Sequence, residues 1–432
     1  MPRFRQGGKS MDTANNSIAN DLSGLTRSKL PKLSIGERDQ RWAAVRSEMN
    51  REGIDCLLVH GDSGKWDQKF SNMRYLSQIG GNGEDGWLVF PLHGEPRAFV
   101  FSGGAMLKLW SEMQDWVSDV RTVPGLRWSE SLIASLRELG MSAGKIGIVG
   151  LGGYLECEGT VSYTTLMRLK EQFPKAEFCN ATLIVENLQL CKSEEEIQFI
   201  EKAVEIGDQA IKIMRELAKP GVPEITVFSK TLEALIEAGS EQPVTFFWDA
   251  GPEVNHGQRF PGRAILEKGD VIVTEISPRF CGYWAHFQAP VAVGGLNPMY
   301  KELFEAAYSA YMNALELFRP GIRLGDLARA FEAPIKEAGM TSLHVYAHGT
   351  GGRGTEFPVI FPPSRSKLMS PESLADFERV MNIEIKKGMV LAFEPHVTKD
   401  MVHGLHLGDP VVVTDNGCRR LSKLDLRNWS AE

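Results

Sequence analysis

Residues that can bind a metal or move a proton interrupt apolar stretches at four places in this sequence. Glu275 ends "VIVTE", His286 lies in "GYWAHFQ", His348 opens "HGTGGRGTEFP", and Glu394 follows "GMVLAF". A buried carboxylate is costly unless it is paired or coordinated. Any one of these residues alone could be a hydrogen-bonded core residue, whereas the whole set favours one shared polar site. We therefore predict that these residues form a catalytic site, a metal-binding site, or both.

Three further residues have side chains that suit work on a small substrate. His256, in "WDAGPEVNHGQRFPG", has an imidazole suited to proton transfer, and the alternative is a loop histidine in solvent. Trp248, in "FFWDAG", is predicted to line the substrate pocket or else to pack in the core. Arg353 is predicted to bind a substrate carboxylate through two hydrogen bonds, or else it is an ordinary surface arginine.

Composition limits the class of protein. The chain has 432 residues, 43% hydrophobic and 24% charged, so one very large globular domain or two ordinary ones are expected. The net charge of −7 argues against nucleic acid or an anionic membrane as a partner. No run of about eighteen apolar residues is present, so we expect no membrane span. Six cysteines without CxxC spacing indicate free thiols in a reducing compartment, and we expect a cytoplasmic protein.

A polar tail and an α/β domain are predicted for the first part of the chain. Residues 1–33 lack the apolar segment of a signal peptide and are predicted to be flexible. Over 34–190, helical patterns such as "ERDQRWAAVRSEMNREG" alternate with strand patterns such as "IDCLLVHG" and "KIGIVG". This alternation predicts an α/β domain with a mixed sheet.

A second domain is predicted over 191–432. Ser193 and Glu196 have the spacing of a capping box at the start of a long amphipathic helix. Long helices over 299–318 and 324–339 then separate groups of strands, among them "GDVIVTEIS", "GMVLAFEPHVT" and "GDPVVVT". Grouped strands with segregated helices predict an α+β domain. The predicted site belongs to this domain, because its residues stand on these strands or next to them.

The order of several motifs resembles one known fold family. Between residues 37 and 422 the chain carries "NMRYLSQI", "LCKSEEEIQFIEKA", "KGDVIVTEISPRFCGYWAH", "FRPGIRLGDL", "HGTGGRGTEFP", "KKGMVLAFEP" and "GLHLGDPVVVTDNG". These motifs are similar to those of the pita-bread superfamily, which contains methionine aminopeptidase, prolidase, proline-specific aminopeptidases and creatinase. The resemblance implies an α/β N-terminal domain followed by an α+β pita-bread C-terminal domain. It also implies a homodimer in which one subunit borders the active site of the other.

The resemblance also identifies the metal-binding positions. Peptidases of this family bind two metal ions through Asp, Asp, His, Glu and Glu, and these positions fall here on Glu275, His286, His348, Glu394 and Gly408. The second and last positions bridge the two ions, but here they are an imidazole with one free lone pair and a glycine with none. We therefore expect no two-metal site. One zinc, iron or manganese ion would bind to His286, His348 and Glu394, with Glu275 as fourth ligand or general base, or no metal binds, as in creatinase.

Other positions imply a changed substrate. Thr355 stands where the family's aminopeptidases have a second histidine, and His406 replaces the family's usual arginine. His406 and Glu356 are predicted to contact the substrate, and His256 lies near the histidine that is the general acid and base of creatinase. We therefore expect a creatinase-like hydrolase of a non-peptide C–N bond. A lyase resembling the family's dimethylsulfoniopropionate lyase and a non-catalytic binding protein are the alternatives.

Overall fold

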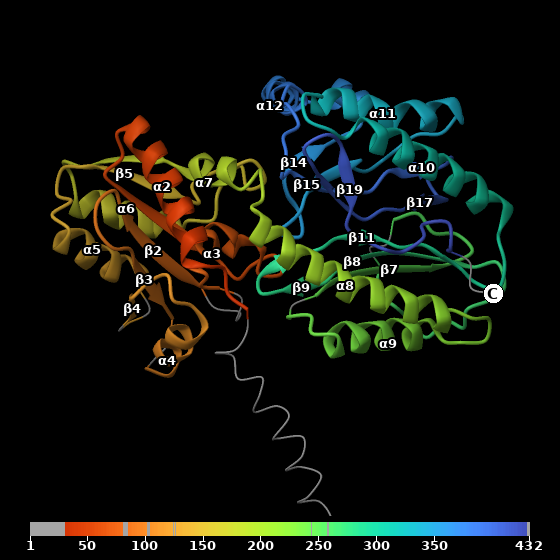
Figure 1. Cartoon of the computed structure of the whole chain (residues 1–432), viewed down its shortest axis with the longest axis horizontal. Helices are drawn as coiled ribbons and strands as arrows, with labels where there is room; N and C mark the ends of the chain where they lie inside the picture. Colours follow the sequence, from red (N-terminus) through yellow and green to blue (C-terminus); the bar gives the residue numbers. More distant parts are fainter. Residues whose placement is uncertain are drawn as a thin grey trace, which may run out of the picture.

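The structure is a computed structural model. It describes residues 31–80, 85–101, 104–123, 125, 127–242, 244–256 and 259–429, except for the side chains of 104–106 and 111. The predicted tail over 1–33 lies outside the described residues, apart from 31–33. Figure 1 shows two lobes side by side. We call the elements from α2 to α7 the N-lobe and those from α8 to β19 the C-lobe.

The N-lobe is built on one mixed sheet with the strand order β4-β3-β2-β1-β5-β6, in which β1 is antiparallel to β2 and parallel to β5. Leu57 and Val59 of β1 pack into one core cluster, and Cys56 and Leu58 pack into another, so both faces of the sheet are covered. The strands are β1 (Cys56–Gly61), β2 (Gly86–Pro91), β3 (Arg97–Val100), β4 (Asp119–Thr122), β5 (Lys145–Val149) and β6 (Glu177–Asn180). The helices are α2 (Ile35–Glu52), η3 (Gln68–Phe70), α3 (Ser71–Ser77), α4 (Gly104–Met113), α5 (Trp128–Glu138), α6 (Tyr163–Gln172) and α7 (Thr182–Leu188).

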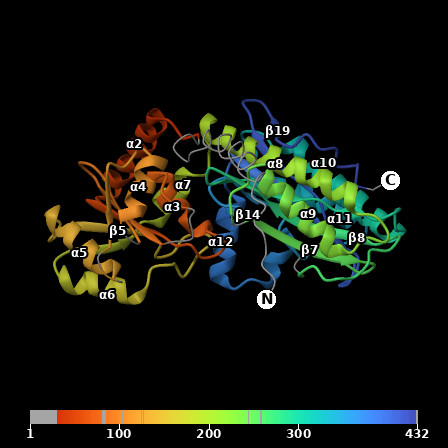
Figure 2. The same cartoon turned by 90° about the horizontal axis from the view of Figure 1, so that it is seen from below.

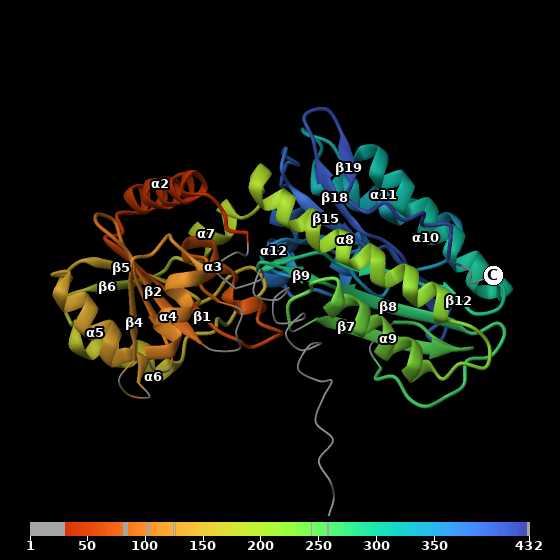
Figure 3. The ribbon, with the colours of Figure 1, turned by 60° about the horizontal axis from the view of Figure 1, so that its bottom comes forward.

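The C-lobe begins with the long helix α8 (Glu194–Leu217). Ser193 Oγ accepts a hydrogen bond from Glu196 N at 3.2 Å, and the Glu196 carboxylate accepts one from Ser193 N at 3.0 Å, which confirms the predicted capping box. The other helices are α9 (Glu224–Glu237), α10 (Pro298–Leu317), α11 (Leu324–Glu337), η4 (Pro363–Leu368) and α12 (Pro371–Met381). Figure 3 shows α8 and α9 in front of the strands, with α10 and α11 behind them.

Two groups of strands carry the interior of the C-lobe. One has the order β11-β8-β12, with β7 also paired to β8, and the other has the order β14-β13-β15-β18-β19; β9 with β10 and β16 with β17 form short pairs. Their bounds are β7 (Thr245–Gly251), β8 (Val271–Ser277), β9 (Arg279–Phe280), β10 (Tyr283–Trp284), β11 (Phe287–Gln288), β12 (Val291–Ala292), β13 (Ala347–Gly349), β14 (Glu356–Ile360), β15 (Val390–Phe393), β16 (His396–Thr398), β17 (Gly404–His406), β18 (Pro410–Val413) and β19 (Cys418–Arg420).

The alternation along β8 decides where its carboxylate faces. Ile272 and Ile276 pack into the core cluster that includes α8, whereas Val271 and Val273 pack into the cluster that includes α10 and α11. Successive strand residues face opposite sides of a sheet. Glu275 therefore faces the same side as Val271 and Val273, toward the interior of the C-lobe.

Buried ion pairs join the two lobes. Arg41 of α2 lies 2.6 Å from Glu37 and 3.2 Å from Glu196 of α8, and Arg279 of β9 lies 2.9 Å from Asp67. All of these side chains are buried, and removing one partner of a buried pair is strongly destabilising. Figure 2 shows α3, α7 and α12 where the lobes meet. The pairs of Arg41 with Glu196 and of Arg279 with Asp67 therefore link the two lobes through buried charges.

This architecture confirms the predicted fold class. The N-lobe has helices on both faces of a mixed sheet, as an α/β domain does, and the C-lobe has grouped strands with segregated helices, as an α+β domain does. None of the described helices is both long enough and apolar enough to cross a membrane.

Candidate active site

The structure brings together the residues that interrupted apolar stretches of the sequence. Glu275 lies on β8, His286 lies between β10 and β11, His348 lies on β13, and Glu394 follows β15. β13 pairs with β15, and β11 pairs with β8 opposite Glu275. Strand pairing therefore places residues that are far apart in the sequence at one point in the C-lobe.

A triad of His286, His348 and Glu394 forms the first part of this site. His348 Nε2 lies 3.2 Å from Glu394 Oε1, and His286 Nε2 lies 3.4 Å from Glu394 Oε2. One ligand atom of each residue lies within 4.8 Å of the others, and all three side chains are buried. Two imidazoles and one carboxylate are a common ligand set for a single zinc or iron ion.

Surrounding hydrogen bonds fix the orientation of the triad. His348 Nδ1 lies 2.8 Å from Gly349 O, which can only accept, so Nδ1 carries the proton and Nε2 presents a lone pair to Glu394. Ser277 Oγ lies 2.6 Å from His286 Nδ1, and Gln288 Nε2 donates to Glu394 Oε2 at 2.6 Å.

Glu394 Oε1 has no hydrogen-bond donor among the described residues. When Glu394 is ionised, its Oε1 therefore faces the lone pair of His348 Nε2 with no donor between them. This arrangement is unfavourable, and a cation between the two atoms would satisfy both. The residues present therefore fit one divalent metal ion.

Glu275 lies beside the triad and next to a further histidine. Its Oε1 lies 3.2 Å from His256 Nε2 and 3.8 Å from His406 Nδ1, and its Oε2 lies 3.9 Å from His286 Nε2. His256 and His406, both predicted from the sequence, therefore join the same cluster. His406 is fully buried, and neither ring nitrogen has a hydrogen-bond partner among the described residues.

Burial and neighbouring groups set different states for the two carboxyl groups. Burial raises the pKa of Glu394 to about 8, and the nearby His348 offsets only part of this effect. Burial also acts to raise the pKa of Glu275, but the nearby imidazoles of His256 and His286 lower that pKa below its ordinary value. Glu275 is therefore a carboxylate at neutral pH, whereas Glu394 favours the protonated form unless a cation lies beside it.

The imidazoles of His286, His348 and His406 are neutral at physiological pH. Burial lowers the pKa of His286, of His348 and, to a larger extent, of His406. A neutral imidazole keeps one lone pair, which is the form that binds a metal.

Two histidines that the sequence analysis did not select complete the cluster. The ring centroid of His344 lies 4.3 Å from that of His256, and the centroid of His396 lies 6.1 Å from it. Burial lowers the pKa of His344 to about 4 and that of His396 to about 3. A local signal was present, because His344 precedes His348 by four residues and His396 follows Glu394 by two.

Trp248 does not reach the cluster. Its side chain is fully buried, its Nε1 donates to Glu224 Oε2 at 2.8 Å, and its ring contacts Phe228 and Phe246 edge to face. This packing corrects the predicted role of Trp248 in an aromatic substrate wall, since no face of the ring is open to a ligand.

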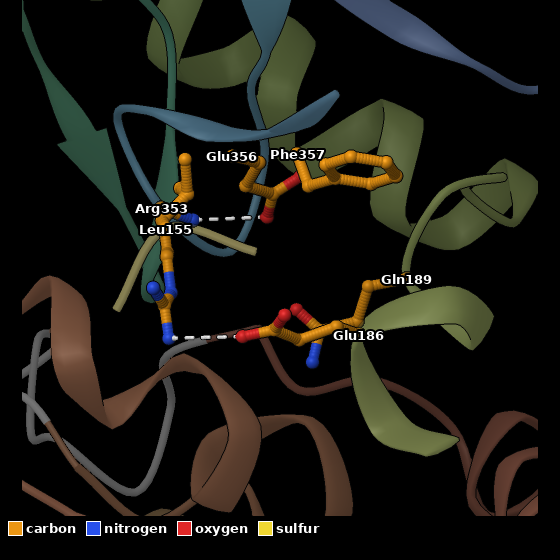
Figure 4. Close-up of a pocket in the computed structure, with 6 residues that line it drawn as sticks. All are labelled: Leu155, Glu186, Gln189, Arg353, Glu356 and Phe357. Atoms are coloured by element: carbon orange, nitrogen blue, oxygen red, sulfur yellow. Dashed lines mark hydrogen bonds and ion pairs between the residues drawn. The ribbon is translucent and has the colours of Figure 1, made fainter. Parts of the chain in front are cut away.

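Arg353 and Glu356 lie at the boundary between the lobes instead of in the cluster. Arg353 Nε donates to Ser71 Oγ at 2.5 Å, and Glu356 Oε2 accepts from Lys192 Nζ at 2.5 Å. Figure 4 shows both side chains lining a small pocket, in which Arg353 also lies 3.9 Å from Glu186. Arg353 therefore bonds across the boundary between the lobes, and Glu356 pairs with Lys192 in the segment between α7 and α8. Their predicted contact with substrate stays a prediction.

The structure leaves no room for a side chain at Gly408. Gly408 exchanges two backbone hydrogen bonds with Gln288, at 2.9 and 3.0 Å, and a Cβ added to it would overlap the carbonyl oxygen of Phe393. The adjacent Asp409 is buried and accepts from Tyr311 Oη at 2.7 Å and from Arg420 Nε at 3.1 Å. Neither position therefore supplies a carboxylate to the site.

Known proteins resemble this chain over both lobes. A model of metallopeptidase family M24 matches residues 198–415, and a model of the creatinase/prolidase N-terminal domain matches residues 41–191. An Xaa-Pro dipeptidase of Pyrococcus furiosus is 28% identical over 277 residues, which are 63% of this chain and 74% of that protein. The solved prolidase of Pyrococcus horikoshii OT3 has a TM-score of 0.71 at 20% identity and covers 89% of this chain and 99% of that chain. These matches confirm the predicted pita-bread fold.

The same comparisons overturn the predicted substrate class. Two relatives, 28% and 27% identical to this chain, are named Xaa-Pro dipeptidase, whereas a creatinase of Bacillus sp. is 23% identical over 299 residues. The expectation of a non-peptide C–N hydrolase, with a lyase or a binding protein as alternatives, is therefore wrong. That expectation rested on the loss of the bridging ligands, which was taken to indicate a change of substrate. Ligands decide how many ions bind, whereas the surrounding pocket decides which bond is presented to them.

Proposed function

This chain belongs to metallopeptidase family M24, and we propose that it hydrolyses the peptide bond of small Xaa-Pro substrates with one divalent ion in an altered metal site. The observation that carries the proposal is the convergence of His286, His348 and Glu394, whose ligand atoms lie within 4.8 Å of one another in a buried site. The substrate class follows the names of the Xaa-Pro dipeptidases that this chain resembles.

His286 and His348 would bind the ion through Nε2, and Glu394 would bind it through a carboxylate oxygen. When bound, such an ion polarises a carbonyl group and acidifies water. Two nitrogen ligands and one oxygen ligand favour zinc or iron over magnesium or calcium. Ser277 and Gln288 orient His286 and Glu394, so the ligands are held in place before the ion binds.

Glu275 is the group placed to accept a proton in this site. Its Oε2 lies 3.9 Å from His286 Nε2, next to the triad, and its lowered pKa keeps it ionised at neutral pH. A carboxylate that lies beside the triad and is not one of its ligands can take a proton from water and deliver it to the leaving nitrogen. The general acid and base role predicted for His256, and the predicted homodimer, stay predictions.

The proposal is tested by reconstituting metal-free protein separately with Zn²⁺, Fe²⁺ and Mn²⁺ and measuring proline release from several Xaa-Pro dipeptides. We expect hydrolysis with at least one ion and a loss of about 100-fold or more in Glu394→Gln, because the triad loses its anionic ligand. His403→Gln is the matched control, since His403 lies outside the triad and pairs with Asp400 at 2.9 Å.

The proposal fails if no metal form releases proline from any dipeptide. It also fails if Glu394→Gln retains the activity of the His403→Gln control.

A further inference from the structure

We infer that this chain has a second cation site, formed by His256, Glu275 and His344 and separate from the triad of the proposed function. The ligand atoms of these residues lie within 4.8 Å of one another. His256 Nε2 lies 3.2 Å from Glu275 Oε1, and the ring centroid of His344 lies 4.3 Å from that of His256. The set again contains two imidazoles and one carboxylate, which is a ligand set for a single transition-metal ion.

Unsatisfied polar atoms converge on this second site. Buried atoms without a hydrogen-bond partner among the described residues include His256 Nε2, Glu275 Oε1, His344 Nδ1 and both ring nitrogens of His406. Leaving a buried polar group unsatisfied costs about 1–3 kcal/mol. Glu275 Oε1 can only accept, and each neutral imidazole has one ring nitrogen with a lone pair, so a cation between them would satisfy several of these atoms at once. His406, whose Nδ1 lies 3.8 Å from Glu275 Oε1, is available as a fourth ligand.

A hydrogen-bonded histidine holds the two ligand loops together. His396 Nε2 lies 2.8 Å from Asn255 Oδ1, and His396 Nδ1 lies 3.3 Å from Leu343 N. Asn255 and Leu343 directly precede His256 and His344, so this one imidazole positions both histidine ligands from behind. Support of this kind for metal ligands is typical of built sites and is not needed by histidines that only face solvent.

Glu275 lies between the two sites. Its Oε1 faces His256 and its Oε2 faces His286 of the triad. Glu275 can therefore bind the second cation through Oε1 and keep Oε2, on the side of the triad, free for the proton transfer proposed above. The second site therefore compensates for the carboxylate that Gly408 cannot provide, by using nitrogen ligands on the opposite side of Glu275.

The experiment measures bound metal instead of activity. The full-length chain, stripped with a chelator and re-equilibrated with Co²⁺ or Zn²⁺, is passed through a desalting column and analysed for metal per chain, and the Co²⁺ form is analysed by visible absorption. We expect about two ions per chain in the unmodified protein and about one in His344→Gln, with weaker Co²⁺ absorption. His403→Gln should retain about two, since its side chain pairs with Asp400 on the surface.

Circular dichroism of each variant shows whether it is folded, and His256→Gln provides a second, independent removal of a ligand. The inference is overturned if the unmodified protein binds only one ion, or if His344→Gln and His256→Gln both bind as many ions as the control. In the first case His256 keeps only the proton-transfer role predicted from the sequence.

Failure of this inference is distinguishable from failure of the proposed function. If only the second site is wrong, one ion per chain remains, and it is lost in Glu394→Gln together with dipeptide hydrolysis. If only the proposed substrate is wrong, the two ions and the effect of His344→Gln persist in a protein that releases no proline.

Discussion

Replacing Gly408 by alanine should destabilise the C-lobe, although it adds a single methyl group. The added Cβ would overlap the carbonyl oxygen of Phe393 and lie 3.3 Å from Glu394 N. Both are backbone atoms, which cannot rotate away from the contact as a side chain can. Overpacking costs about 1–3 kcal/mol. The φ of 159° is rarely adopted by other residues, and such strain costs about 1–3 kcal/mol more. We therefore expect a loss of about 2–6 kcal/mol in unfolding free energy.

The assay is thermal unfolding followed by circular dichroism. A loss of this size lowers the midpoint by roughly 5–20 °C for a domain of about 200 residues. Gly417→Ala is the matched control, because no described heavy atom lies within 4 Å of a Cβ added there. Gly408→Ala should also bind metal more weakly, since relief of the overlap moves the backbone at Glu394. Equal midpoints for the two variants would refute the reasoning, as would a Gly408→Glu variant that folds normally and gains an ion.

Two further predictions concern the surroundings of the site. Gln288→Ala removes the donor to Glu394 Oε2, so we expect metal affinity to fall by about 10–100-fold with little change in fold. An unchanged affinity in a metal titration would contradict the role given to Gln288. Burial lowers the pKa of His396 to about 3, whereas a histidine in the unfolded chain has a pKa of about 6.5. Between these two pH values the unfolded chain binds a proton that the folded chain does not, so the free energy of unfolding decreases as the pH falls below about 6.5. Urea unfolding at several pH values should show this loss, and His396 contributes at most about 1.4 kcal/mol of unfolding free energy per pH unit. The dependence of unfolding free energy on pH should be weaker in His396→Gln, and an equal dependence would show that His396 is not responsible.

Short-range patterns in the sequence determined the elements and most of the site. The capping box at Ser193 and Glu196 depends on residues three positions apart, so it could be read without knowing the fold. Charged residues inside apolar strand patterns selected Glu275 and Glu394, because such residues need a partner wherever the strand ends up. The same argument selected His286 and His348, which the structure places against Glu394.

The tertiary structure alone decided which partner each polar side chain has. Arg353 bonds to Ser71, 282 residues earlier, and Glu356 bonds to Lys192, 164 residues earlier. The sequence left Trp248 either in an aromatic pocket wall or in the core, and its buried N–H, bonded to Glu224, places it in the core. These contacts are formed by packing between distant segments, and no local period or spacing encodes them.

The proposed second cation site shows the same difference between what the sequence determines and what the tertiary structure decides. His344 and His396 carry spacing signals relative to His348 and Glu394, but a histidine near a strand is compatible with many environments. Only the folded chain shows that His396 bonds to both Asn255 and Leu343 and so places His256 and His344 around Glu275. Residue type determines which groups can bind a cation, and the close approach of separate loops determines which of them do so together.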